Sequence, residues 1–330
     1  MAKLFNFFSG TNNKNGRGVS KKQAAIDKKL GFKFFFKLTS MRFNKISVSN
    51  LIFFLCNIPI FFLLFGIAGF LDDAVPTATD PLYATLYGIM QNETGPVVSA
   101  VYGAVGTLTE LNVMSVYSQI CVYIGYLLIF TLGISSIGLV YNLRNICKGE
   151  VVDTWRDYFS AIKKNFRQGI VLSILDIIIC WFLVYDIFAY GANADDFVTL
   201  VLYYACIFFA IVFYFMRFYM YIQLVTCKMT IGKILKNSLL LVALGIKRNL
   251  CALLGTVATV FILFYAYILV PQFTLVLILL FAVAFINLIG VYAAYPVVNK
   301  YVIEPYYEEH PEERPEDPWE RTEKVFTDRE

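Results

Sequence analysis

The feature that most constrains this chain is a series of six apolar runs. Crossing the hydrocarbon core of a bilayer takes about 20 apolar residues in an α-helix. The runs lie at about 46–71, 116–143, 169–191, 198–224, 249–270 and 272–298. They are continuously apolar and do not alternate, which is typical of spanning helices and not of barrel strands. The sequence therefore predicts an all-α integral membrane protein with six transmembrane helices.

The composition argues against the soluble classes of protein. Hydrophobic residues make up 58% and charged residues 16% of the chain, whereas soluble domains contain about 25% charged residues. The seven cysteines lie in or beside apolar runs without CxxC spacing, so we expect no disulfide or metal framework. His310 is the single histidine, which excludes His-based zinc sites and catalytic triads. We therefore expect no enzyme activity and no cofactor.

The distribution of basic residues predicts the orientation of the bundle. The segments between the first and second runs and between the third and fourth runs contain acids but no Lys or Arg. All 28 bases lie in 1–45, 144–168, 217–248 and the tail from 300 onward. Because bases near span ends stay on the cytoplasmic side, we expect both termini in the cytoplasm.

The two terminal segments differ in charge. Residues 1–45 are basic with one acid, Asp27, so we expect them to lie in the cytoplasm on anionic lipid headgroups and not to bind nucleic acid. Residues 304–330 contain four prolines and eleven acids, a composition that favours a disordered cytoplasmic tail. The predicted membrane domain thus occupies 46–303.

The outer segment at 72–115 is longer than a simple connection between the first two spans needs to be. Leu82, Leu86 and Met90 are spaced as in one short helix. A second predicted helix contains Val97, Val101, Val105, Leu108 and Leu111. The segment either embeds partly as a cap over the bundle or covers its outer ends as a surface pair of helices.

Residues 153–168 are predicted to form an amphipathic interfacial helix that Asp153 caps. Its apolar residues share one helical face and are Trp155, Phe159, Ile162 and Phe166. The basic residues Lys163, Lys164 and Arg167 lie elsewhere on this helix. Such a helix lies at the headgroup level of a bilayer, or its mixed aromatic and charged surface binds a membrane or cytoplasmic protein. Residues 230–246 show a similar pattern.

Two ionisable residues fall inside predicted spans, where an unpaired charge costs a few kcal/mol. Asp176 lies roughly 12 Å into the third run at 1.5 Å per residue, and Arg217 lies in the fourth. They form an intramembrane polar pair, or Arg217 snorkels to headgroups, or both line a transport path. Because transport paths usually recruit more ionisable groups, we favour the structural alternatives.

A resemblance to a family rests on three motifs. They are Thr131-Leu132-Gly133 within a small-residue helix, Lys148-Gly149-Glu150, and the run from Trp155 to Asn165-Phe166-Arg167-Gln168. This pattern resembles the YesL-like bacterial membrane proteins (domain of unknown function 624) over most of 30–303. The chain departs from the family where about 70 residues separate Pro59 from Thr131.

The resemblance implies a multi-pass protein of a bacterial cytoplasmic membrane and no catalytic residues. It favours a non-enzymatic accessory or regulatory protein linked to carbohydrate uptake. The alternative is a small-solute transporter or permease component that uses the bundle interior near Asp176 and Arg217.

The predicted orientation is tested by labelling single cysteines in intact and lysed cells. Cysteines introduced at positions 80, 93 and 195 should react with a membrane-impermeant reagent from outside, because their segments contain no bases. Cysteines at 15, 150 and 320 should react only after lysis. Labelling of position 150 from outside would show that the bundle has the opposite orientation to the predicted one.

Overall fold

The computed structural model describes residues 31–92, 95–150, 152–193 and 196–313. Among these residues, five helices are long and apolar enough to cross a membrane: Val116–Lys148, Thr154–Ala192, Phe197–Thr226, Ile246–Leu269 and Pro271–Glu309. A sixth span results if the broken pair Phe43–Cys56 and Pro59–Ile67 is counted as one. The prediction of a multi-pass helical membrane protein is therefore confirmed.

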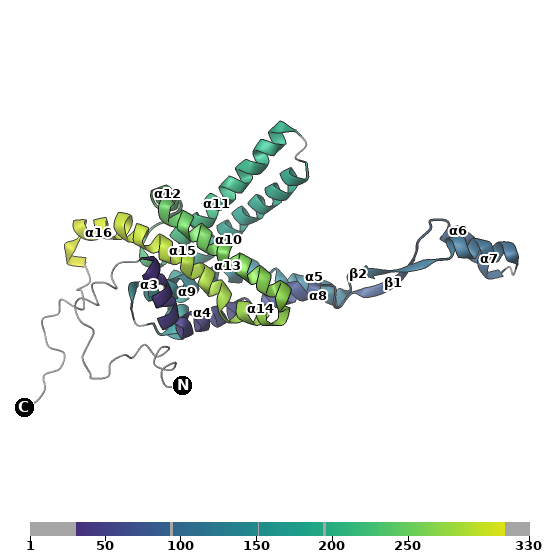
Figure 1. The fold of residues 1–330 in the computed structure, drawn as a ribbon, viewed down its shortest axis with the longest axis horizontal. Coiled ribbons are helices and arrows are strands. Elements are labelled where there is room, and N and C mark those ends of the chain that lie inside the picture. Colours follow the sequence, from purple (N-terminus) through teal and green to yellow (C-terminus); the bar gives the residue numbers. More distant parts are fainter. Residues whose placement is uncertain (1–30, 93–94, 151, 194–195, 314–330) are drawn as a thin grey trace, which may run out of the picture. The chain divides into compact units, whose positions relative to one another are not determined.

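The chain divides into two compact units. The core unit consists of Met1–Cys56 and Leu132–Glu330, and the hairpin unit is Asn57–Thr131. The helices that build the core unit are α3 (Phe32–Met41), α4 (Phe43–Cys56), α9 (Leu128–Lys148), α10 (Thr154–Ala192), α11 (Phe197–Thr226), α12 (Ile231–Leu244), α13 (Ile246–Leu269), α14 (Pro271–Leu277), α15 (Val283–Val298) and α16 (Glu304–Glu309) (Figure 1). Two π-helical segments, Ile278–Ala282 and Asn299–Ile303, join α14, α15 and α16 into one long helix.

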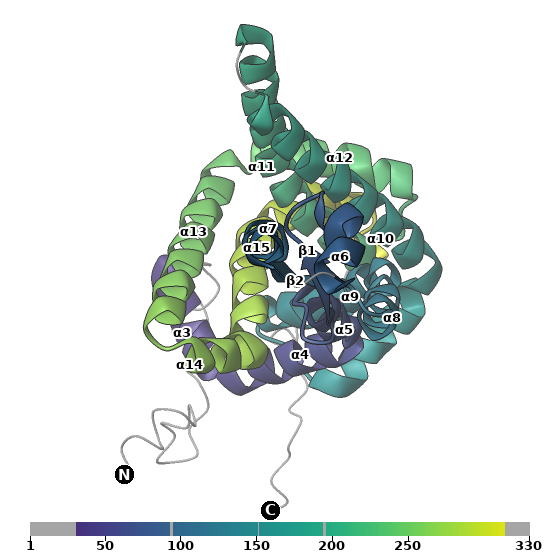
Figure 2. The same cartoon turned by 90° about the vertical axis from the view of Figure 1, so that its right-hand side faces the viewer.

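The core unit is built from helices that are neighbours in sequence and from α15. Helix α10 packs along α11, α11 along α12, and α15 contacts both α11 and α13 (Figure 2). Buried aromatic residues fill the centre, among them Tyr158 and Tyr219, which are fully buried. The other faces of the long helices carry exposed apolar side chains, such as Phe208 and Phe261, as expected for surfaces that face lipid.

Glycines let the core helices approach closely. A Cβ added to Gly133 on α9 would lie 2.8 Å from Cα of Ser173 on α10. A Cβ added to Gly138 would lie 2.5 Å from the ring of Tyr158, whose hydroxyl donates a hydrogen bond of 2.6 Å to the Ser135 carbonyl. Small residues at such contacts are a usual device of membrane helices, because close backbones gain dispersion energy that lipid cannot supply.

Asn50 on α4 explains the first π-helical segment. Its amide nitrogen donates to the carbonyls of Ile278 and Leu279, at 3.0 and 2.6 Å. Its amide oxygen accepts a hydrogen bond of 2.7 Å from the backbone N–H of Ala284. A widened turn frees backbone groups that have no water partner in a membrane, and one buried side chain from another helix satisfies three of them.

The hairpin unit consists of two helix pairs joined by a strand ladder. Helix α5 (Pro59–Ile67) packs along α8 (Val116–Gly125), with glycines at the contact: a Cβ on Gly66 would lie 2.8 Å from the Ser118 carbonyl oxygen. Strand β1 (Asp73–Ala78) pairs antiparallel with β2 (Leu108–Val113), in the register Asp73 to Val113. Helices α6 (Tyr83–Asn92) and α7 (Pro96–Val105) follow β1 and precede β2.

Three predictions made from the sequence are corrected. Residues 153–168 are not a separate interfacial helix, because α10 runs unbroken from Thr154 to Ala192. The predicted second outer helix ends at Val105, and Leu108 and Leu111 lie in β2. The predicted disordered tail is helical over Glu304–Glu309, because that segment continues the last span. The remaining tail, 314–330, and residues 1–30 lie outside the described residues.

The continuous helix α10 and the strand β2 each have a physical reason. No proline interrupts α10, and a helix that has begun extends at little cost. Pro59, in contrast, begins α5 after a break of two residues that follows Cys56, since a proline inside a helix removes a hydrogen bond and clashes with the preceding turn. The strand at Leu108–Val113 forms because it gains a partner in β1, which a pattern of apolar residues does not reveal.

Close packing at Gly133 is tested by substitution with alanine. Gly133→Ala should lower the free energy of unfolding by about 1–3 kcal/mol, because the added methyl meets the α10 backbone. Gly232→Ala on α12 is the matched control: nothing lies within 4 Å of its added Cβ, so it should be neutral or stabilising by up to about 1 kcal/mol. Thermal unfolding in detergent, followed by maleimide reaction of the buried Cys147 as the single cysteine, measures both. Equal changes in unfolding free energy for Gly133→Ala and Gly232→Ala would mean that α9 and α10 are not closely packed at Gly133.

Candidate functional site

The structure brings Asp176 and Arg217 together between α10 and α11. Nε of Arg217 lies 2.8 Å from Oδ1 of Asp176 and 3.0 Å from Oδ2. The Tyr221 hydroxyl donates a hydrogen bond of 3.0 Å to Oδ2, and the Cys180 thiol lies 3.8 Å from Oδ1. Arg217 and Tyr221 are one turn apart on α11, so both reach the same carboxylate on the neighbouring helix.

The geometry of this Asp176 cluster fits a structural ion pair. The Asp176 side chain is 1% exposed, and Arg217, Tyr221 and Cys180 occupy its two oxygens. In the described part of the chain, no group of three His, Cys, Asp or Glu residues is arranged to hold a metal ion. The cluster therefore joins α10 to α11 through an ion pair and a tyrosine hydrogen bond.

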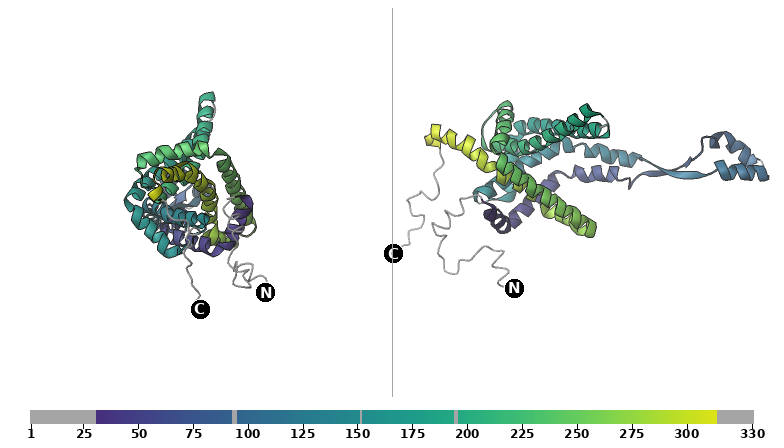
Figure 3. Two further views of the ribbon diagram at one scale, coloured as in Figure 1. Left: turned by 90° about the vertical axis from the view of Figure 1, so that its left-hand side faces the viewer. Right: turned by 45° about the horizontal axis from the view of Figure 1, so that its top comes forward.

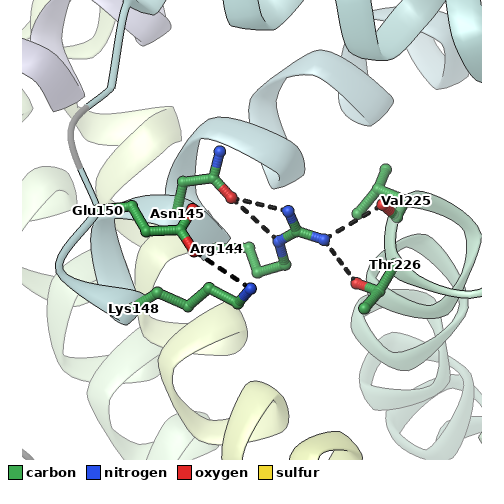
Figure 4. A network of polar contacts seen from close by, with 6 residues as sticks. All are labelled: Arg144, Asn145, Lys148, Glu150, Val225 and Thr226. Carbon is green, nitrogen blue, oxygen red and sulfur yellow. Dashed lines mark hydrogen bonds and ion pairs between the residues drawn. The ribbon is translucent and has the colours of Figure 1, made fainter. Parts of the chain in front are cut away.

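A second polar cluster, centred on Arg144, was missed by the sequence analysis (Figure 4). There Arg144 was counted as one of the bases of a cytoplasmic loop, but it lies in α9 and is only 7% exposed. Its Nε and one terminal nitrogen donate to Oδ1 of Asn145, at 3.1 and 2.8 Å. The other donates to the Val225 carbonyl at 3.1 Å and to the Thr226 hydroxyl at 2.8 Å.

Arg144 ties α9 to the C-terminal end of α11. The last carbonyls of a helix have no partner within it, and a cation there is stabilised by the helix dipole. The guanidinium also lies 4.7 Å from the ring centre of Tyr141, where a cation–π contact forms. The sequence contained a sign of this cluster, because three polar residues, Asn142, Arg144 and Asn145, follow an otherwise apolar run. The nearby pair of Lys148 and Glu150, at 3.3 Å, is exposed and contributes little.

A cavity of about 530 Å³ with a mixed polar and apolar lining lies next to Thr226, beyond the end of α11. Its walls are the segment 226–229 and the side chains of Val302, Ile303, Tyr306, Tyr307 and Glu313. Tyr306 and Glu313 are joined by a hydrogen bond of 2.6 Å across one wall. Burial raises the pKa of the Cys227 thiol above its usual value, while the Arg144 charge opposes that rise. Cys227 is therefore held as a neutral thiol and is not set up as a nucleophile.

The predicted face of residues 155–167 lies on the outside of α10. Trp155, Phe159 and Phe166 are 51%, 46% and 48% exposed, and Trp155 stacks on Phe159 with ring centres 6.1 Å apart. The helix packs inward through another face, which carries Thr154, Tyr158 and Ala161. Lys163, Lys164 and Arg167 are exposed, whereas Ile162 is half-buried. We term the exposed side chains of this segment the α10 aromatic face; they are Trp155, Phe159, Lys163, Lys164, Phe166 and Arg167. The three rings share one side of the helix, Lys164 lies on the opposite side, and Lys163 and Arg167 lie between them.

One family model matches the chain. Its description is "Protein of unknown function, DUF624", and the match covers residues 108–187. The resemblance predicted from the sequence is thereby confirmed over this region, which contains Arg144, the α10 aromatic face and Asp176 but not Arg217. No curated protein and no solved structure matches the chain.

The pairing of Asp176 with Arg217 is tested by a double-mutant cycle. Asp176→Asn and Arg217→Gln should each lower the free energy of unfolding by about 1–3 kcal/mol, because each leaves the other charge without its partner. The double variant should lose less than the sum, by on the order of 1 kcal/mol. Thermal unfolding in detergent measures all four proteins.

Glu150→Gln combined with Arg217→Gln serves as the control, because these two residues share no contact in the structure. The losses in unfolding free energy from these two substitutions should add. Additivity in the Asp176 cycle as well would show that Arg217 gains its stability elsewhere, at lipid headgroups.

Proposed function

We propose that this protein is a non-enzymatic accessory protein of a membrane assembly, and that a partner protein binds the α10 aromatic face. The observation that carries the proposal is the exposure of Trp155, Phe159 and Phe166 among basic residues. Aromatic residues and arginine are enriched where proteins bind one another, and stacked rings have little conformational freedom to lose. The inward packing of α10 uses other residues, so this face is not needed to hold the core together.

The interior of the core unit supports this proposal over a transporter. Asp176, Arg217 and Tyr221 bind one another across helices. The lining of the cavity near Thr226 includes neither Asp176 nor Arg217. A transport site needs ionisable groups that face a substrate cavity near the middle of the bilayer, and these two charges face each other.

The remaining parts of the proposal rest on charge and on the family resemblance. The positive-inside distribution of the 28 bases supports a cytoplasmic location for the α10 aromatic face and both termini. The resemblance supports a bacterial cytoplasmic membrane and a partner among the proteins of carbohydrate uptake. Anionic headgroups beside Lys163, Lys164 and Arg167 would strengthen docking at the membrane surface.

Photocrosslinking in cells tests the proposed partner face. A photoreactive phenylalanine at Phe159 or Phe166 should give one discrete protein adduct, because both side chains are exposed beside the bases. The same group at Phe188 or Phe197 is the matched control, since these residues are 74% and 79% exposed but lie at the far ends of α10 and α11. Lys163→Glu with Lys164→Glu should reduce the adduct severalfold if the bases take part.

Two results would contradict the proposal. Adducts with lipid alone at Phe159 and Phe166 would mean that the face only anchors α10 at the membrane surface. Saturable sugar flux into liposomes that contain the purified protein, lost on Asp176→Ala, would favour the transporter.

A further inference from the structure

An apolar groove of about 600 Å³ is lined by residues of α3, α13 and α15. Figure 3 shows the ribbons of the core unit from two further sides. Small residues of α13 form its floor: Ala252, Gly255 and Ala258. Phe35 of α3 and Phe285 of α15 form its walls, with ring centres 5.8 Å apart. The groove exists because the small side chains of α13 leave space that the neighbouring aromatic rings do not fill. We term it the α13 groove.

The α13 groove runs along one face of its helix. The α13 residues that line it begin at Lys247 and Arg248 and end at Ile262, with spacings of three and four between Arg248, Cys251, Gly255 and Ala258. At 1.5 Å per residue this stripe is roughly 21 Å long. One leaflet of hydrocarbon is about 15 Å thick, half of the bilayer core. The groove therefore extends from one surface of the membrane through the depth of a leaflet.

The charge of the groove is confined to one end. Lys247 is exposed and Arg248 is half-exposed in the first turn of α13. Neither makes an ion pair within the part of the chain that the structure describes. The rest of the lining is almost entirely hydrocarbon. Two cations above a long apolar slot match an amphiphile with an anionic head, since Arg and Lys bind phosphate oxygens well.

Helix α3 holds the groove in shape. The Tyr292 hydroxyl on α15 donates a hydrogen bond of 2.8 Å to the Gly31 carbonyl, and the Phe35 ring packs edge-on against the Tyr292 ring at 5.2 Å. Phe32 and Phe36 remain 80% and 55% exposed beside the opening. The wall is thus fixed on one side, while the slot stays open to the acyl chains that surround α13.

We propose that the α13 groove binds an anionic phospholipid of the surrounding bilayer. Its phosphate lies on Lys247 and Arg248, and one acyl chain follows the stripe from Ala252 to Ile262. A sugar or a nucleotide would find too few polar partners along this lining, whereas an acyl chain needs none. The groove contains no residue of α10, so this site is separate from the proposed partner face.

Native mass spectrometry of the full-length protein, titrated in detergent with phosphatidylglycerol or phosphatidylcholine, tests the site. The wild-type protein should bind phosphatidylglycerol about tenfold more tightly than phosphatidylcholine, because Lys247 and Arg248 attract the net negative charge of phosphatidylglycerol. Lys247→Gln with Arg248→Gln should abolish this preference. Lys233→Gln with Lys236→Gln on α12 removes the same charge from exposed positions that do not line the groove and should leave the preference unchanged.

The acyl-chain part of the site is tested separately. Ala258→Phe fills the slot and should weaken binding of both lipids at least severalfold. Val257→Phe, on an exposed face of α13 that does not line the groove, is its control and should have no effect. Size-exclusion profiles show whether each variant is folded, and the comparison of two lipids on the wild-type protein requires no variant.

Three results would overturn the proposal. Equal affinity of the wild-type protein for the two lipids would remove the headgroup site. Equal losses from the substitutions on α13 and on α12 would reduce the preference to general surface charge. Unchanged binding in Ala258→Phe would show that the acyl chain does not enter the groove. None of these results depends on whether a protein binds the α10 aromatic face.

Discussion

Helices inside a hydrocarbon layer gain little from covering one another's apolar surface, because lipid chains are as apolar as the side chains. The core unit therefore depends on a few polar contacts between helices and on close approach at small residues. The ion pair of Asp176 and Arg217 is the most demanding of these contacts, since either charge alone in the hydrocarbon region would cost a few kcal/mol. It joins α10 to α11, the pair that also carries the Tyr221 hydrogen bond.

The other buried polar groups act in the same way at different depths. Asn50 satisfies the widened turn at Ile278–Ala282 and so joins α4 to the last span. Arg144 binds the unpaired carbonyl of Val225 at the end of α11. Gln223 donates to the Ser238 hydroxyl at 2.9 Å and fastens α12 against α11. Because each bond joins segments that are separate along the chain, the bonds select one arrangement of helices among many that bury similar apolar area.

The polar groups of the core unit thus divide between structure and recognition. The buried groups described above bind other helices, which leaves the bonded atoms unavailable to a substrate. Exposed bases lie on the α10 aromatic face and at the mouth of the α13 groove. This division supports the proposed roles in binding a partner protein and lipid.

Much of the fold could be predicted from the sequence, because membrane insertion is governed by local composition. Runs of more than 20 apolar residues placed the spans, and the position of Pro271 placed the tight connection between α13 and α14. Asp176 and Arg217 were recognisable as a candidate pair because each is expensive in a membrane. The exposed face of α10 followed from helical spacing alone.

Other features needed the tertiary structure, since they depend on what lies beside a residue. Arg144 was counted as a surface base until α11 placed a carbonyl and a hydroxyl against it. The strand at Leu108–Val113 forms because it pairs with β1. The α13 groove forms because aromatic rings of α3 and α15 stand beside the small residues of α13. The sequence by itself determined which segments enter the membrane, because transfer into lipid depends on each segment's own residues. Only the tertiary structure decided which polar groups bind other helices and which remain exposed to a ligand or partner, because that depends on contacts between segments far apart in the chain.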